Sequence, residues 1–226
     1  MAPAGAQARA GRVKPRWWND AAADLARRDP VMRALVRAYP GVSLKRRSDA
    51  FTALARAITG QQISVQAADA IWRRFVALAD PGAATERFPK LDPGRVASLD
   101  RPALRAAGFS ERKADYLHDL AGHFASGRLD PRGWKRLDDE ALIAALVDVR
   151  GIGRWTAEMF LMFHELRPDV YPVDDLGLQK AVAQHYTGGR AQSLRALRAH
   201  GERWRPWRTA ATWYLWRSLD PIPIEY

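Results

Sequence analysis

The chain has 226 residues and a formal net charge of +11, from 36 Lys and Arg against 25 Asp and Glu. It contains no Cys, which excludes disulfides, thiol catalysis, Cys-ligated zinc and cysteine-bound iron–sulfur clusters. Its five His do not fall at zinc-binding spacing, and no apolar run approaches the roughly 20 residues that span a bilayer. A chain this basic favours a polyanionic partner, with nucleic acid first, although a generally basic surface would carry the same charge.

The first segment, residues 1–16, is rich in Ala, Gly, Arg and Pro. It has no apolar stretch of the kind that a signal peptide needs. We predict a disordered basic tail there, and we expect a cytoplasmic protein.

Apolar residues recur at helical spacing nearly everywhere, and no segment alternates as a half-buried strand would. The sequence therefore predicts an all-α fold of roughly ten helices, with turns at Pro81-Gly82 and Asp92-Pro93-Gly94. Cap residues bound the expected helices, with Ser48, Ser64, Ser110 and Asp138 as N-caps. In chain order we expect helices over 48–60, from about 64, and over 102–108, 110–127, 138–147, 154–166, about 175–186, 190–200 and 206–219.

No Ser/Gly-rich hinge divides the chain into separate domains. We therefore expect two helical lobes that share a groove. The first lobe would comprise about residues 48–165, and the second about 17–47 together with 166–226.

The segment Leu142–Thr156 predicts a helix, a tight turn and a second helix. Gly151 and Gly153 permit positive φ and leave backbone amides uncovered, and the following helix adds free N–H groups and the positive end of its dipole. A phosphate oxygen fits such a turn whatever the base sequence. A helical corner with glycines chosen only for shape would have the same sequence.

Two adjacent carboxylates, Asp174 and Asp175, precede the next expected helix. One of them can cap that helix, which is worth about 1 kcal/mol, but capping does not account for two. An anion near DNA phosphates weakens DNA binding, so it is not expected there unless the function needs it. Cleavage of a glycosidic bond needs such a group, because a fixed anion stabilises the oxocarbenium-like transition state and can orient the attacking water.

These residues resemble a known family. Leu146–Ala157 followed by Tyr171–Asp175 is similar to the signature of the helix-hairpin-helix DNA glycosylase superfamily. The segment Trp204–Trp216 resembles its 3-methyladenine DNA glycosylase II branch, Ile58–Ser64 resembles the loop that this family inserts into DNA, and Gly108–Ala114 also fits. The resemblance covers about residues 48–217. It implies the compact, all-helical form of the family, without the N-terminal β-domain of the best-known bacterial member.

The resemblance implies an all-α fold whose two lobes flank a DNA-binding cleft that carries a helix-hairpin-helix motif. It assigns the catalytic role to Asp175. Trp155 stands where lyase-competent relatives carry a nucleophilic Lys, which implies that water attacks and no Schiff base forms. The implied base pocket contains Trp155 and Trp216, with weaker candidates Tyr171, Met159 and Leu176. Core packing is the alternative for Trp155 and for the other aromatic residues near Trp216.

Met159 and Leu176 depart from the family, because the best-known bacterial branch has aromatic residues there. The substrate range is therefore open: hypoxanthine, N1-methyladenine and ethenoadenine are candidates beside 3-methyladenine and 7-methylguanine. An electron-rich pocket suits cationic alkylated purines, because a cation over an aromatic face gains roughly 0.5–2 kcal/mol.

The implied DNA contacts come from the hairpin and from the inserted loop. Gln62 matches the wedge that fills the space left by an extruded base, with Ile63 as second choice; the alternative is an ordinary interhelical turn. The backbone at Val149 and Gly151 is implied to hold a monovalent cation, with no other cofactor. The implied DNA-binding residues are Gly151, Gly153, Arg154, Thr156, Gln61, Gln62 and Ile63.

Residues 190–217 carry seven Arg and one acid, Glu202. This stretch can line a DNA groove, or it can be a solvated helix face with Arg–Trp packing. Arg205 and Arg208 are expected to pair with buried acceptors.

The sequence thus predicts a monofunctional DNA glycosylase that removes alkylated purines from double-stranded DNA in base excision repair, acting as a monomer at the nucleoid. Two alternatives stay open. One is a non-catalytic protein that binds damaged DNA, and the other is a glycosylase/lyase for oxidised bases.

Overall fold

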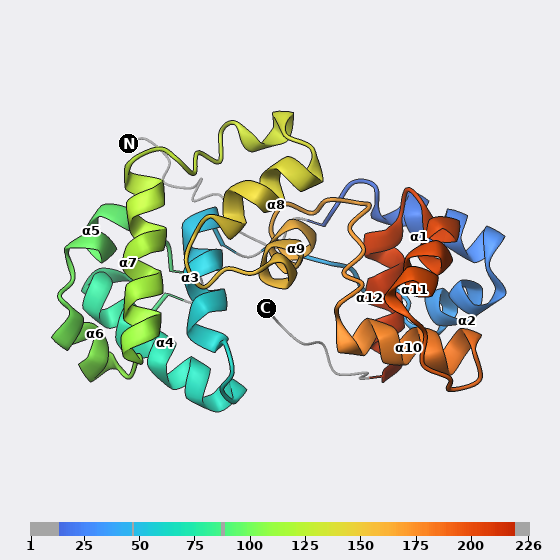
Figure 1. Ribbon diagram of the computed structural model, residues 1–226, viewed down its shortest axis with the longest axis horizontal. Helices are drawn as coiled ribbons and strands as arrows, with labels where there is room; N and C mark the ends of the chain where they lie inside the picture. The colour runs from blue at the N-terminus through green and yellow to red at the C-terminus, as the bar shows by residue number, and fades with distance from the viewer. Residues whose placement is uncertain (1–13, 47, 87–88, 220–226) are drawn as a thin grey trace, which may run out of the picture.

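The computed structural model describes residues 14–46, 48–86 and 89–219 of the chain. Within these ranges the protein is helical and contains no strand, which confirms the all-α prediction (Figure 1). Residues 1–13 of the predicted tail lie outside the described ranges. The α-helices are α1 Trp18–Arg28, α2 Pro30–Ala38, α3 Ala50–Gly60, α4 Val65–Ala79, α5 Pro93–Ser98, α6 Arg101–Ala107, α7 Glu111–Ala125, α8 Asp139–Val147, α9 Arg154–Phe163, α10 Leu176–Tyr186, α11 Leu194–Gly201 and α12 Arg208–Leu219, and the 3-10 helices are Pro81–Ala83, Trp134–Arg136 and Glu202–Trp204.

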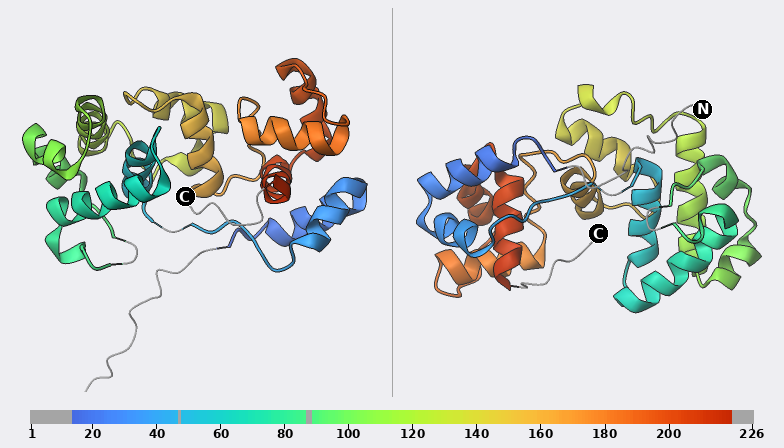
Figure 2. Two further views of the ribbon diagram at one scale, coloured as in Figure 1. Left: turned by 90° about the horizontal axis from the view of Figure 1, so that it is seen from below. Right: turned by 180° about the vertical axis from the view of Figure 1, so that it is seen from behind.

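The buried apolar side chains form two clusters. The first draws on α3 to α9, and the second draws on α1, α2 and α10 to α12. Figure 1 shows α3 to α7 on one side of the molecule, α1, α2 and α10 to α12 on the other, and α8 and α9 between them. Phe163, at the end of α9, packs against both clusters. The chain crosses between the two halves after α2 and again after α9, as the views from below and behind in Figure 2 also show.

Three of the four expected N-caps are confirmed. Ser64, Ser110 and Asp138 accept hydrogen bonds from the backbone N–H three residues on, at the starts of α4, α7 and α8. The expected cap at Ser48 is wrong, because Asp49 accepts from Thr52 N instead. A carboxylate one residue later takes the position, and the helix starts at Ala50.

Three expectations on element boundaries are also wrong. Asp92-Pro93-Gly94 is the start of α5 rather than a turn, with Asp92 as N-cap and Pro93 in the first helical turn. Pro81 likewise begins a 3-10 helix, for which Asp80 is the cap. The helix that was expected to reach Leu166 ends at Phe163, and Leu166 has a φ of 56°, which no α-helix accommodates.

Candidate active site and nucleic-acid interface

Asp175 is the hub of the candidate active site. Its Oδ1 accepts a hydrogen bond from Leu178 N at 2.6 Å and from Trp216 Nε1 at 2.8 Å, and its Oδ2 accepts from Trp155 Nε1 at 3.0 Å. An ionised carboxylate is an acceptor only, and these three donors satisfy that form. The arrangement therefore holds an anion in a fixed orientation, with Oδ2 carrying the fewer bonds.

The position of Asp175 follows from its role as the N-cap of α10. The helix end contributes the Leu178 N–H and places the carboxylate in the favourable field of the helix dipole. Capping is therefore done by the second residue of the pair, the one assigned the catalytic role. Asp174 is exposed and does not cap α10.

Gly177 makes room for the contact between Trp216 and Asp175. A Cβ at this position would lie 3.1 Å from Asp175 Oδ1 and 3.2 Å from the Trp216 ring. Behind the carboxylate, the Trp216 ring stacks on Phe163 with centroids 6.0 Å apart and ring planes 7° apart. The indole that holds Asp175 is thus itself held by α9, which connects the two core clusters.

The structure brings two of the five predicted pocket residues directly to Asp175. Trp155 is 40% exposed, so its ring is not core packing, and Trp216 is partly buried. Tyr171 is not brought to this group: its ring packs against Gly201 in the second core cluster and is only 8% exposed. Burial also raises the pKa of the Tyr171 hydroxyl.

The two positions that depart from the family differ in environment. Met159 is buried in the first core cluster, whereas the Leu176 side chain is 78% exposed at the start of α10. Of the aromatic residues near Trp216, for which core packing was the alternative, Trp213 and Tyr214 are buried, and both pack against Trp18.

A network of charged residues joins the start of α9 to α8. The Arg154 guanidinium donates from Nε to Glu158 at 3.0 Å, and its two terminal nitrogens donate to the exposed Glu140 at 2.8 and 2.5 Å. Glu158 is 3% exposed. Burial raises its pKa to about 7 against the lowering effect of Arg154, and the negative charges of Asp174 and Glu140 add to the rise. Arg154, predicted to contact DNA, is thus held between two carboxylates.

The hairpin follows α8 as predicted, and its two glycines serve different purposes. Gly151 has a φ of +85°, and a Cβ there would lie 2.2 Å from the Tyr116 ring, so no other residue fits. Gly153 does not use the positive φ that glycine permits: it has a φ of −90° and is the N-cap of α9. Nothing lies within 4 Å of its Cβ direction, so the start of α9 is open there, and the half-buried Thr156 follows in the first turn.

The hairpin carbonyls proposed to hold a monovalent cation already accept hydrogen bonds. Val149 O accepts from Ile152 N at 3.0 Å, and Gly151 O accepts from Gln61 Nε2 at 2.9 Å. Each carbonyl oxygen keeps a second lone pair for a further ligand. In the described part of the chain, no group of three or more His, Cys, Asp or Glu could hold a metal ion.

The loop between α3 and α4 carries three of the seven residues predicted to contact DNA. The amide of Gln61 is engaged with the hairpin, as described above. Gln62 has a φ of 58°, a left-handed conformation that is uncommon outside glycine. Ile63 is 38% exposed, and Ser64 caps α4.

The basic C-terminal stretch is partly structural. Arg208 donates to both carboxylate oxygens of Asp169, at 2.7 and 3.0 Å, and Arg205 donates to the same carboxylate at 2.9 Å. The expected pairing of these two arginines is therefore confirmed, with Asp169 as the shared, largely buried acceptor.

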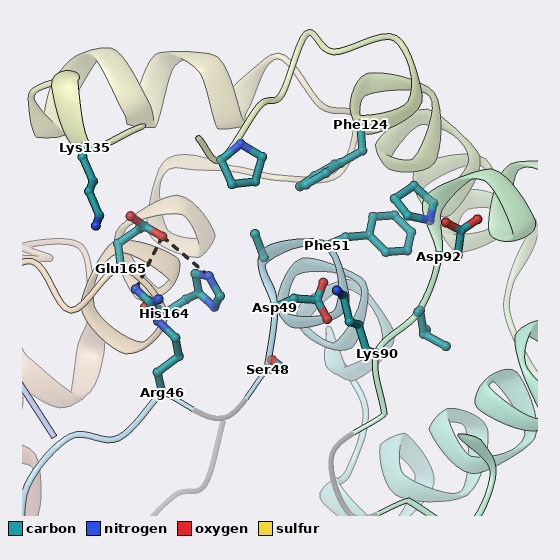
Figure 3. Close-up of a pocket in the computed structure, with 14 residues that line it drawn as sticks. Arg46, Ser48, Asp49, Phe51, Lys90, Asp92, Phe124, Lys135, His164 and Glu165 are labelled. Carbon is teal, nitrogen blue, oxygen red and sulfur yellow. Dashed lines mark hydrogen bonds and ion pairs between the residues drawn. The ribbon is translucent and has the colours of Figure 1, made fainter. Parts of the chain in front are cut away.

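A pocket of about 600 Å³ lies elsewhere, at the N-terminal end of α3 and the C-terminal end of α9 (Figure 3). Asp49, before α3, and His164, after α9, line it. Since α3 has 11 residues, the pocket is about 16 Å from the loop that follows this helix. Burial and the charge of Arg46 lower the pKa of His164 to about 3, so this ring is neutral. The pocket is separate from the Asp175 group.

Sequence reasoning missed three residues that support the site. Lys113 lies in the matched segment Gly108–Ala114 but was given no role, although it donates from Nζ to Thr59 O and Gln61 O at the end of α3. Glu158 lies four residues after Arg154, the spacing that marks helical ion pairs, and was also given no role. Gly177 gave no signal, because its importance depends on the position of Trp216.

Comparison with known proteins supplies the context for this geometry. Residues 55–206 match the family described as HhH-GPD superfamily base excision DNA repair protein. DNA-3-methyladenine glycosylase 1 of Schizosaccharomyces pombe is 36% identical over 180 residues, which cover 79% of this chain and 76% of that protein. In the described part of this chain, no helix is long and apolar enough to cross a membrane.

Two solved structures share the fold. A DNA-3-methyladenine glycosidase from Bacillus halodurans has a TM-score of 0.78 at 32% identity, with 93% of each chain covered. The Schizosaccharomyces pombe 3-methyladenine DNA glycosylase in complex with abasic DNA has a TM-score of 0.73 at 34% identity, covering 88% of this chain and 96% of that one.

Proposed function

The chain belongs to the HhH-GPD superfamily of base excision DNA repair proteins, and from this premise we propose that it is a monofunctional DNA glycosylase that excises alkylated purines. The observation that carries the proposal is the Asp175 carboxylate, held as an anion by two indole N–H groups and a helix N-terminus. Relatives of this chain are DNA-3-methyladenine glycosylases, which supports the same substrate class.

The chemistry that this site supports is hydrolysis of the bond between C1′ of deoxyribose and the purine nitrogen. As the bond breaks, its electron pair leaves with the base, and a purine that carries positive charge from methylation leaves as a neutral molecule. The sugar is left with oxocarbenium character, which the Asp175 anion stabilises. Water then adds at C1′ and loses a proton to Asp175 or to solvent, so the products are the free base and an abasic site.

Recognition would come from the aromatic groups beside the carboxylate. Trp155 is the more exposed of the two indoles and would present its face to the extruded base, since a cation over an aromatic face is attracted. Trp155 also stands where lyase-competent relatives carry Lys, so no amine is placed to form a Schiff base. The alternative of an oxidised-base lyase is therefore disfavoured.

The hairpin would bind the DNA backbone through the open amides at Gly153 and the first turn of α9. A monovalent cation held by the second lone pairs of Val149 O and Gly151 O would add positive charge at the phosphate without a covalent role. Gln62 or Ile63 would fill the gap in the base stack. We expect the protein to act as a monomer on chromosomal DNA in the cytoplasm.

The test is base release from a duplex treated with a methylating agent, followed by chromatography of the freed purines. The wild-type protein is expected to release 3-methyladenine, and Asp175→Asn is expected to abolish release while it keeps affinity for the duplex. Asp174→Asn is the matched control, because that carboxylate is exposed and does not cap α10. Wild-type binding without release would instead indicate a damage-binding protein, and a borohydride-trapped adduct would indicate a lyase.

A further inference from the structure

Two loops that the proposed function places on DNA come from distant parts of the sequence and are bonded directly to each other. Gln61, in the loop between α3 and α4, donates from Nε2 to Gly151 O of the hairpin at 2.9 Å, across 90 residues of sequence. The bond occupies one N–H of the Gln61 side-chain amide. Gln61 thus fixes the distance between the loop and the hairpin.

A second contact holds the base of the same loop. Lys113, in the first turn of α7, donates from Nζ to Thr59 O and to Gln61 O, both at 2.8 Å. These carbonyls belong to the end of α3, where a helix lacks internal donors. Partial burial lowers the pKa of the Lys113 ammonium, and its charge points at the loop backbone. The loop is therefore tied down at a main-chain carbonyl and at a side chain.

What these two contacts hold in place is a strained turn. Gln62, directly after the anchored residue, has a φ of 58°, a conformation that costs a non-glycine residue free energy and persists only where its surroundings impose it. The next residue, Ile63, is exposed, as is Gln62. The contacts of Gln61 and Lys113 therefore hold the start of the turn against the protein, and the two exposed side chains directly follow it.

Helix α7 also packs against the hairpin. Tyr116 lies one turn after Lys113 on α7, so the two side chains share a helix face. The Tyr116 ring fills the space where Gly151 lacks a side chain, and Arg112 donates to the Tyr116 hydroxyl at 3.1 and 3.3 Å. One face of α7 therefore carries both DNA-facing loops.

From this geometry we infer that Lys113 and Gln61 are positioning residues that lock the loop of residues 61–63 to the hairpin, so that phosphate contact and insertion of the loop into the base stack occur in one register. The inference rests on the proposed function, because it requires DNA as the ligand. It assigns Lys113 no contact with DNA. Its effect is confined to lesion-specific binding, in which a base is extruded and the loop enters the gap.

The experiment compares Lys113→Met with wild type on two duplexes of the same sequence, one undamaged and one with a tetrahydrofuran abasic analogue. The ratio of the two dissociation constants measures lesion-specific binding. A fluorescent 2-aminopurine beside the analogue reports entry of the loop into the stack. We expect the variant to lose about tenfold in the ratio, the size of one hydrogen bond to a charged group, with a smaller fluorescence change and nearly unaltered affinity for undamaged DNA.

Arg74→Met is the matched control. Arg74 also donates to the end of a helix in the same half of the molecule, from Nε to Ala107 O at 2.8 Å, but it touches neither DNA-facing loop. It is expected to lower thermal stability as Lys113→Met does and to leave the ratio unchanged. Lys113→Arg, which keeps the cation, is expected to restore part of the ratio.

Three results would overturn the inference. Loss of affinity for both duplexes, with a salt dependence reduced by about one ion, would make Lys113 a direct phosphate contact. An equal fall in the ratio for the Arg74 variant would make the effect one of stability alone. Additive effects of Lys113→Met and Gln61→Met would mean that the two anchors are not one unit. Failure of the proposed function is distinguishable, because it is measured as the absence of base release by the wild-type protein, whereas the inference is measured as a change in the binding ratio between wild type and variant.

Discussion

Trp216 donates its indole N–H to Asp175 Oδ1 at 2.8 Å, although 41 residues separate them in the chain. The bond joins the last long helix to the N-cap of α10. Stacking on Phe163 fixes the indole from behind. The orientation of the carboxylate thus depends on three elements, α9, α10 and α12, whose relative positions are set by the core.

Trp216→Phe removes this donor and keeps an aromatic ring. We expect the single-turnover rate of base release to fall about tenfold, because a hydrogen bond to an ionised group is worth about 1.5 kcal/mol or more. Rapid quench of a labelled, alkylated duplex measures the rate. Trp207→Phe is the control, since Trp207 donates its indole N–H to Asp24, remote from Asp175, at 3.1 Å. Equal rates for the two variants would contradict a role for the Trp216 bond.

Gly151→Ala is expected to destabilise the fold by roughly 2–4 kcal/mol, because a left-handed backbone and a clash with the Tyr116 ring add together. Gly153→Ala should cost far less, because its φ is ordinary and its Cβ direction is open. Urea denaturation of the two variants measures the difference. Similar midpoints for both would show that the Gly151 turn relaxes more easily than the structure indicates.

Glu158 predicts a dependence of stability on pH. Its folded pKa of about 7 lies above its ordinary value of 4.5, so the folded state binds more protons than the unfolded state between these pH values. The free energy of unfolding therefore falls as pH rises through this window, by about 3 kcal/mol from this group. The stabilising contribution is fully present below pH 4.5 and is lost above pH 7.

Glu158→Gln should remove that contribution. Denaturation at pH 5 and pH 8 should show a smaller loss of stability in the variant than in wild type, while Glu111→Gln, at an exposed carboxylate, should match wild type. If the Glu158 variant loses as much stability as wild type over this range, the carboxyl group is ionised throughout in the folded protein.

Arg208→Gln should destabilise the protein without changing how DNA affinity depends on salt. Arg208 is largely buried and makes a two-pronged contact with Asp169. Its loss is expected to cost about 1.5–3 kcal/mol, the size of hydrogen bonds to a charged group, because Asp169 then keeps only Arg205 as its cationic partner. Arg198→Gln, at an exposed position, is the control for stability. A reduced salt slope for the Arg208 variant would place this arginine on the DNA instead.

The sequence by itself determined the helical class, most helix starts and the hairpin, because these depend on local properties: apolar spacing, short polar caps, and glycine where φ is positive. Ser64, Ser110 and Asp138 cap their own helices through bonds to residues three positions away. Such contacts do not depend on what lies across the molecule. Local rules failed at Ser48, where the neighbouring carboxylate was the better cap.

Only the tertiary structure decided which side chains meet. Tyr171 and Trp155 were both pocket candidates, yet one ring is buried against Gly201 and the other reaches Asp175. Lys113 contacts the loop only because α7 packs beside the end of α3. Contacts between residues tens of positions apart are set by how helices pack, and packing depends on the shapes of all the core side chains together.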